Sequence, residues 1–241
     1  MKYLALALFL FLFVFLFSCR NNEKQTGDNI QKSTIIDSVF IQKAESTEIE
    51  TVDIPITADV IAKVKPKAQA WLRYYSLDIS DFTLSDSSVF YLQNCYTQDI
   101  EISPDELKAD PFRDLYAFSP DRSKLIDMYY YESYDEKRGT VVFGGEPDQA
   151  VWLYDIKAQK AYQVWFTGPS GVCDAVFWIN NNSFVLLTNY DNEYSIVIYD
   201  SEEENKKIYA VEGNARPDTG SFFYYDGKRK GVKDPIYSEN E

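Results

Sequence analysis

The sequence contains no histidine among its 241 residues. This absence excludes Ser-His-Asp and Cys-His nucleophile pairs as usually built, and metal sites that use imidazole ligands. The chain also lacks the Gly-x-Gly-x-x-Gly motif and the nucleophile patterns Gly-x-Ser-x-Gly and Ser-x-x-Lys. We therefore predict no metal site, no cofactor and no assignable catalytic residue. Carboxylate-only catalysis, as in glycosidases, stays open, but 38 acidic residues make any chosen pair arbitrary.

Basic residues are scarce relative to acidic ones. The chain has 24 Lys+Arg against 38 Asp+Glu, and without residues 1–18, which include Lys2, the balance is 23 − 38 = −15. Such a charge repels the phosphates of nucleic acids and anionic membrane surfaces. The composition therefore predicts no nucleic-acid partner.

The N-terminus carries an apolar run from Tyr3 to Phe17 behind a positive start at Lys2. The run is shorter than the roughly 20 residues of a spanning helix and fits the apolar region of a secretory signal. Its end, Leu16-Phe17-Ser18-Cys19, resembles the lipobox of bacterial lipoproteins, although Phe17 is bulkier than usual.

That resemblance implies a signal peptide over 1–18, diacylation of Cys19 and anchoring in the cell envelope through the lipid. The alternative is an uncleaved membrane anchor. Arg20 follows the cysteine instead of the aspartate of the enterobacterial retention signal, so the resemblance favours the outer membrane, with either face open.

Cysteine is also rare, with three residues in the chain. If Cys19 carries lipid, Cys95 and Cys173 are the candidates for a disulfide in an oxidising compartment. The alternative is two buried, unpaired thiols that behave as small apolar residues.

The rest of the chain divides into four segments. Residues 19–56 are polar or weakly patterned and predict a tether and extended linker. Apolar residues at three- and four-residue steps predict a helix over 57–76, with Thr57 as its cap and Pro66 kinking or dividing it. Short aromatic-rich runs broken by turn residues predict a β domain over 77–235, followed by a tail over 236–241.

An internal repeat lies within the β domain. The first unit has a Pro-Asp turn at Asp121 and an apolar strand ending at Tyr154-Asp155, and the second has an Asn-rich turn at Asn181 and a strand ending at Tyr199-Asp200. These spacings, 34 and 19 residues, differ by 15, which predicts an insertion within 131–147.

The first unit, Ser-Pro-Asp-x-Ser-Lys-Leu followed by a strand ending Tyr-Asp, resembles the blade repeat of bacterial Tol-associated and WD-like β-propellers. The resemblance covers about residues 114–211, with weaker echoes at 82–92 and 222–227. A closed propeller needs at least four blades of roughly 40–50 residues, more than this domain holds. The expected fold is therefore mainly β, with propeller-like antiparallel blades in an incomplete or degenerate ring and one N-terminal helix.

An aromatic and acidic segment flanks the predicted insertion. Its candidate ligand-binding residues are Tyr129, Tyr131, Tyr134, Asp135 and Glu136. Loops on a rigid β scaffold often carry function, and aromatic rings beside carboxylates suit a sugar. The alternative is that alternate tyrosines fill the core.

These observations together predict an envelope lipoprotein with a non-catalytic, protein-binding domain. An incomplete ring leaves edge strands that can accept a partner, and the expected partner is another envelope protein. The alternative function is a glycan-binding module or a carboxylate-only glycosidase.

Overall fold

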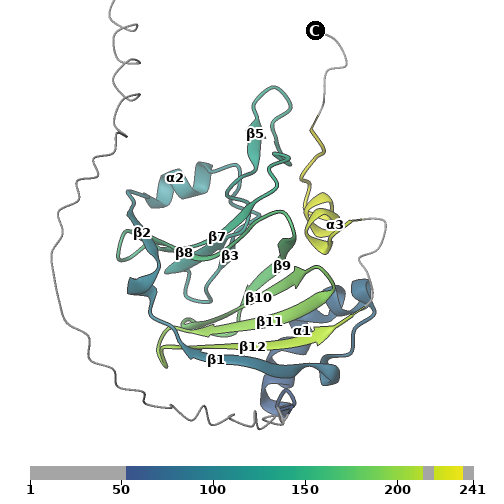
Figure 1. Cartoon of the computed structure of the whole chain (residues 1–241). Helices are drawn as coiled ribbons and strands as arrows, with labels where there is room; N and C mark the ends of the chain where they lie inside the picture. The colour runs from purple at the N-terminus through teal and green to yellow at the C-terminus, as the bar shows by residue number, and fades with distance from the viewer. Residues whose placement is uncertain (1–52, 214–219, 236–241) are drawn as a thin grey trace, which may run out of the picture. The chain divides into compact units, whose positions relative to one another are not determined.

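A computed structural model describes residues 53–213 and 220–235 of the chain (Figure 1). The predicted signal peptide, Cys19, the tether up to residue 52 and the tail 236–241 lie outside the described residues. Within the described part, two five-stranded sheets and one hairpin hold the named strands, and all pairings between these strands are antiparallel. The mainly β fold class predicted from the sequence is confirmed.

Sheet B lies between residues 96 and 167 and has the strand order β2-β8-β7-β4-β3. Its strands are β2 (Tyr96–Asp99), β3 (Ala117–Phe118), β4 (Lys124–Asp127), β7 (Gln149–Asp155) and β8 (Lys160–Thr167). Four of them form a meander, and β2 is added beside β8. A hairpin of β5 (Ser133–Asp135) and β6 (Thr140–Val142) lies between β4 and β7, at the predicted insertion.

Sheet A repeats this plan with the strand order β1-β12-β11-β10-β9. Its strands are β1 (Thr83–Val89), β9 (Gly171–Trp178), β10 (Ser183–Tyr190), β11 (Glu193–Asp200) and β12 (Asn205–Glu212). Here β9 to β12 form the meander, and β1 is added at its outer edge. Each repeat unit of the sequence thus supplies the four-stranded meander of one sheet.

The Tyr-Asp ending of each unit forms the same kind of turn. Asp155 ends β7, and its Oδ1 accepts from the backbone N–H groups two and three residues further on, at 3.0 and 2.8 Å. Asp200 ends β11 and accepts from the corresponding N–H groups at 3.0 and 2.9 Å. An aspartate here ends the strand because its side chain satisfies backbone donors of the turn.

The first turns of the two units contact each other. The backbone N–H of Asp121 donates to Oδ1 of Asn181 at 3.0 Å, and Nζ of Lys124 donates to the carbonyl of Asn181 at 3.2 Å. Nearby, the indole N–H of Trp178 on β9 donates to the carbonyl of Ala117 on β3 at 2.8 Å. Equivalent elements of the two units therefore lie against each other.

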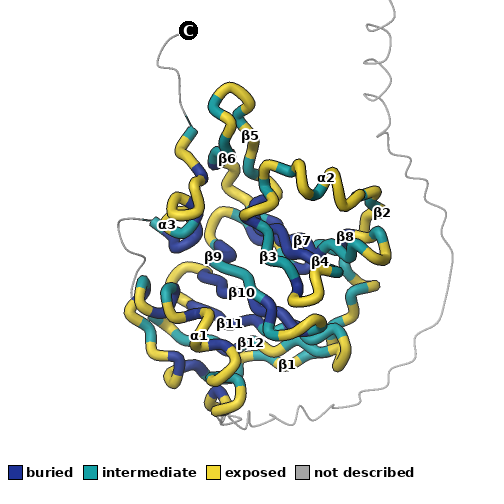
Figure 2. Tube along the Cα trace, turned by 180° about the vertical axis from the view of Figure 1, so that it is seen from behind, coloured by how far each residue is buried: buried dark blue, intermediate teal, exposed yellow. Residues whose placement is uncertain are grey.

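The main core fills the space between the two sheets. Buried side chains of sheet B, such as Ile126 and Leu153, meet buried side chains of sheet A, such as Phe184 and Leu186, together with Phe223 from the C-terminal part. Figure 2 shows this buried interior along the central strands. Burial of apolar surface between the sheets is the main source of stability for such an arrangement.

Helix α1 (Ala58–Tyr75) covers the outer face of sheet A, away from sheet B. Thr57 caps its start, and its buried face contains Trp71 and Tyr75. Pro66 lies inside the helix but does not divide it, because Pro66 and Ala62, whose carbonyl loses its usual partner, are both exposed to water. No helix within the described ranges has the length and apolar character needed to cross a membrane.

The structure contains more helix than the one predicted. Two short 3₁₀ turns, η1 (Ile79–Asp81) and η2 (Leu92–Asn94), flank β1. Helix α2 (Pro104–Ala109) begins at a capping box of Ser103 and Glu106.

Helix α3 (Phe222–Arg229) replaces the strand-like echo expected at 222–227. In this helix Phe222 packs with α1, and Phe223 packs between the sheets. Gly227 permits a close approach, since a Cβ there would lie 2.8 Å from the ring of Phe143. The expectation of a single helix was wrong for this tertiary reason.

Candidate functional site

The structure divides the predicted ligand-binding residues instead of gathering them. Tyr129 is buried, and its ring lies 5.0 Å from that of Phe223 between centroids, as core packing requires. The carboxylate of Asp135 accepts backbone N–H bonds two and three residues further on, so it closes the β5–β6 turn. Glu136 is exposed in that turn. None of these three side chains lines any of the cavities considered below.

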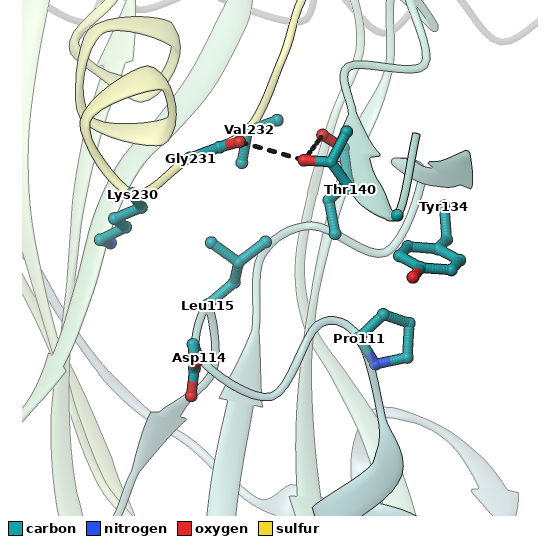
Figure 3. A pocket seen from close by; sticks show the side chains of 10 residues that line it. Pro111, Asp114, Leu115, Tyr134, Thr140, Lys230, Gly231 and Val232 are labelled. Carbon is teal, nitrogen blue, oxygen red and sulfur yellow. Dashed lines mark hydrogen bonds between the residues drawn. The ribbon is translucent and has the colours of Figure 1, made fainter. Parts of the chain in front are cut away.

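Tyr134 lines a cavity of about 220 Å³ between the β5–β6 hairpin and the segment after α3 (Figure 3). Its ring lies beside Pro111, and Lys230 lies across the cavity from it (Figure 3). The hydroxyl of Thr140 donates to the carbonyl of Gly231 at 3.3 Å and joins the two walls. One acidic residue, Asp114, and one basic residue line this cavity, so its charge favours no class of ligand.

The outer face of sheet B, which points away from sheet A, holds a more ordered set of side chains. Strand register places Tyr96, Gln163, Trp152 and Asp127 directly opposite one another across β2, β8, β7 and β4. Directly opposed residues share a face, so these four form one row across the sheet. Their neighbours on the other face, such as Leu153, belong to the main core.

An aromatic ladder follows this row. We use that name for Tyr96, Trp152, Tyr130 and Tyr131, whose successive ring centroids lie 5.8, 5.1 and 5.3 Å apart. Tyr96 is 63% exposed, whereas Trp152 is only 3% exposed beneath its neighbours. Among the described residues, no acceptor reaches Nε1 of Trp152. The ladder is thus a partly exposed aromatic surface, and the indole N–H of its buried member, Trp152, has no acceptor among the described residues.

A cavity of about 330 Å³ lies beside the ladder, between α2 and the outer face of sheet B. Its apolar and aromatic lining is Ile102, Leu107, Tyr116, Leu125 and Tyr154, and its acidic lining is Glu101, Glu106 and Asp110. We call it the acidic cavity, because no basic residue occurs in its described lining. Figure 2 shows α2 as an exposed segment over buried strands of sheet B.

Hydrogen bonds fix the geometry of this cavity. The hydroxyl of Tyr116 donates to Oδ2 of Asp110 at 2.8 Å, and burial raises the pKa of Tyr116. The capping box at Ser103 lowers the pKa of Glu106, because the carboxylate accepts the Ser103 N–H. At neutral pH the tyrosine is therefore neutral, and Glu106 is negatively charged.

Asp127 lies on the same face as Leu125 and Tyr154, which line the cavity. Burial raises its pKa to about 7, while a hydrogen bond from the N–H of Tyr129 at 2.7 Å opposes the shift. The nearby carboxylates of Asp110 and Glu132 raise it further. A carboxyl group without a cation beside it retains its proton in such surroundings.

Glu132 is the second carboxyl group with a raised pKa, also about 7 and also mainly through burial. It lines a different cavity, of about 180 Å³, together with Glu146, Asp148 and Ser221. A glycosidase needs both carboxylates on one scissile bond. Asp127 and Glu132 do not line a common cavity among those described.

The two candidate disulfide cysteines are both free thiols. Cys173 is buried in the main core, with its Sγ 3.7 Å from the carbonyl of Ala175. Cys95 is partly buried beside η2, and its Sγ lies 3.9 Å from the carbonyl of Tyr91. Burial raises the pKa of both thiols, so each is protonated and packs as a small apolar group.

The described residues contain no group of three or more His, Cys, Asp or Glu side chains placed to hold a metal ion. Comparisons with known proteins found no matching family and no similar curated protein or solved structure. The candidate binding site is therefore assigned from geometry alone, and it consists of the aromatic ladder and the acidic cavity on sheet B.

Proposed function

We propose that this protein is a lipid-anchored envelope lipoprotein whose β domain binds a partner protein through the outer face of sheet B. One observation supports the proposal most directly. The two sheets share a strand order, but their outer faces are covered to different extents. A helix of 18 residues covers the outer face of sheet A, whereas α2, the helix over part of the outer face of sheet B, has six residues.

The chemistry of the uncovered face indicates the kind of partner. Tyr96, Tyr130, Tyr131 and Phe166 are all exposed there, and Phe166 is 51% exposed. Exposed aromatic groups beside a pocket are typical of binding surfaces. Because carboxylates line the adjacent cavity, a partner segment that carries Lys or Arg among apolar residues would be complementary to it.

Strand β2 adds a second means of attachment. It is an edge strand, and all four of its residues are exposed. An edge strand presents unpaired backbone donors and acceptors, to which an extended segment can add. A basic, apolar segment along β2 would also reach Tyr96 and the acidic cavity.

We also infer that the two sheets are propeller-like blades in an incomplete ring. Two four-stranded meanders, matching Asp turns and contact between the first turns of both units support this. An experimental structure in which the two meanders superimpose blade upon blade would support it. Meanders of different twist that cannot be superimposed would contradict it.

The envelope location rests on the lipobox-like sequence that ends at Cys19. Replacement Cys19→Ala should abolish labelling with a radioactive or alkyne fatty acid and should leave the precursor uncleaved or release the protein. Cys95→Ala is the matched control and should leave labelling unchanged. Labelling that persists in Cys19→Ala would contradict the proposed anchor.

Photo-crosslinking in intact cells tests the proposed binding face. A crosslinking amino acid at position 96 should capture one envelope protein in stoichiometric amount, and capture should fall when Glu106→Gln and Asp110→Asn reduce the negative charge. The matched control is position 190, because Tyr190 is a comparably exposed tyrosine at the end of β10. Equal capture from both positions, or no capture at 96, would overturn the proposal.

The aromatic ladder also favours a second candidate function, glycan binding, because tyrosine rings can stack against a sugar ring. Trp152 lies within the ladder, so its fluorescence should change when an oligosaccharide binds. Saturable quenching that is lost in Tyr130→Ala and kept in Tyr190→Ala would favour this function. A flat response across a broad oligosaccharide panel would exclude it.

A further inference from the structure

The C-terminal half of α1 and helix α3 line a further cavity, which is basic and aromatic. It shares no lining residue with the acidic cavity. The cavity, of about 510 Å³, is lined by Ala70, Arg73 and Tyr74 of α1 and by Tyr225 and Arg229 of α3. The rings of Tyr74 and Tyr225 lie 5.1 Å apart between centroids. Two arginines more than 150 positions apart therefore face one opening.

The arginines that line this cavity are only weakly engaged by the described residues. Nε of Arg73 donates to the carbonyl of Gln69 at 3.3 Å, and no residue in the described ranges forms an ion pair with this guanidinium. Arg229 lies 5.8 Å from the ring of Tyr225 and 3.8 Å from Asp226, but Lys230 holds that carboxylate more closely, at 2.8 Å.

Charge makes this cavity unusual for the chain. The described lining contains no acidic side chain, although acidic residues exceed basic ones by 14 in the whole sequence. Two like charges at one opening repel each other unless an anion lies between them. A planar guanidinium also offers paired donors that match the oxygens of phosphate.

We propose that Arg73 and Arg229 form a binding site for a phosphate group carried by a small molecule or a lipid headgroup. The guanidinium groups bind the phosphate oxygens, and the rings of Tyr74 and Tyr225 contact the organic part of the ligand. This site is independent of the outer face of sheet B, so either can fail without the other.

Titration of the purified full chain in detergent with inorganic phosphate and glycerol phosphate tests the site. We expect saturable binding that Arg73→Gln and Arg229→Gln each weaken about tenfold, because each removes charge-assisted hydrogen bonds. Arg122→Gln is the matched control, since it removes the same charge from a guanidinium stacked on Phe118. Unchanged urea midpoints would show that the variants fold.

Two further arms distinguish the sources of the phosphate. Short-chain phosphatidylglycerol, compared with short-chain phosphatidylcholine in the same detergent, should bind the wild type but not the two variants if the source is an anionic lipid. Binding of glycerol phosphate alone, with no difference between the two lipids, indicates a soluble ligand. No saturable binding of any probe, or equal weakening by Arg122→Gln, would overturn the site.

Discussion

The two sheets share a strand plan but differ in what lies on their outer faces. On sheet A, β10 and β11 are buried on both faces, because Val185 and Ile196 pack under α1 while Phe184 and Val197 pack in the main core. On sheet B the outer face holds a small buried cluster around Trp152, exposed tyrosines and an acidic cavity. The outer face of sheet A is thus buried and stabilises the fold, whereas the outer face of sheet B is partly exposed and accessible to a ligand.

A buried carboxylate shows the same contrast. Asp174 of β9 accepts from the indole N–H of Trp71 and from the backbone N–H of Phe223, both at 3.0 Å, so it joins α1 and α3 to sheet A. Asp127 of β4 has one recorded hydrogen bond, from the N–H of Tyr129, and lies beside the acidic cavity. One aspartate is surrounded by donors, and the other is surrounded mainly by apolar groups and other carboxylates.

The largest effect is expected where α1 covers sheet A. Trp71→Ala should lower the free energy of unfolding by about 3–5 kcal/mol, because it leaves a cavity under the helix and removes one hydrogen bond from the buried Asp174. Urea unfolding followed by circular dichroism measures this. A loss below about 1 kcal/mol would mean that α1 does not stabilise sheet A in the way described.

The next effect is a pH dependence that arises on sheet B. The folded pKa of Asp127 is about 7, above its ordinary value of 3.8, so the folded state holds a proton that the unfolded chain releases. Stability should therefore fall as pH rises from 5 to 8, by about 2–3 kcal/mol from Asp127 alone. No histidine adds to the change, but Glu132, whose pKa is also raised to about 7, does.

The Asp127→Asn variant sharpens this prediction. It should remove about half of the pH dependence, and Glu132→Gln should remove much of the remainder, since burial also raises the pKa of Glu132 to about 7. Asp99→Asn, on the exposed edge strand, should leave the slope as it is. An unchanged slope in Asp127→Asn would show that Asp127 is already ionised at pH 5.

A paired substitution compares the two buried tryptophans directly. Trp71→Phe loses ring volume and the bond to Asp174, whereas Trp152→Phe loses ring volume and an indole N–H that has no acceptor among the described residues. Trp71→Phe should therefore cost about 1–2 kcal/mol more than Trp152→Phe in urea unfolding. Equal losses would mean that the bond to Asp174 adds nothing.

The smallest effect on stability belongs to the exposed end of the ladder. Tyr96→Ser should change the free energy of unfolding by less than about 0.5 kcal/mol, because most of the side chain is in water. It should nevertheless weaken binding of the sheet B partner. A large loss of stability would instead make Tyr96 part of the core.

Local chemistry explains which parts of the fold could be predicted. The repeat was visible because Asp121, Asp155 and Asp200 each satisfy donors within a few residues of their own position. The capping box at Ser103 and Glu106 was equally local and offered a signal for α2. Helix α3 offered none, since its aromatic residues favour a strand until two separate cores take up Phe222 and Phe223.

The candidate site was predictable only in part, because register is not local. Of the tyrosines predicted from the sequence, Tyr131 belongs to the ladder, where it contacts Tyr130, which was not predicted. Tyr96 and Trp152 join them only through pairing of β2, β8 and β7. Trp152 is buried, but on the outer side of sheet B.

The order of strands also bears on how the chain folds. All strands of sheet B lie between residues 96 and 167, while β1 of sheet A pairs with β12, more than 100 positions further along. Contacts distant in sequence form late, because the intervening chain must first be closed into a loop. Sheet B can therefore form while the C-terminal strands are still emerging, and α1 and β1 must wait for β10 to β12. In the last folding step, α1 and β1 then join a chain in which sheet B is already folded. A truncation before β12 would therefore also remove the strand with which β1 pairs and part of the sheet that α1 covers.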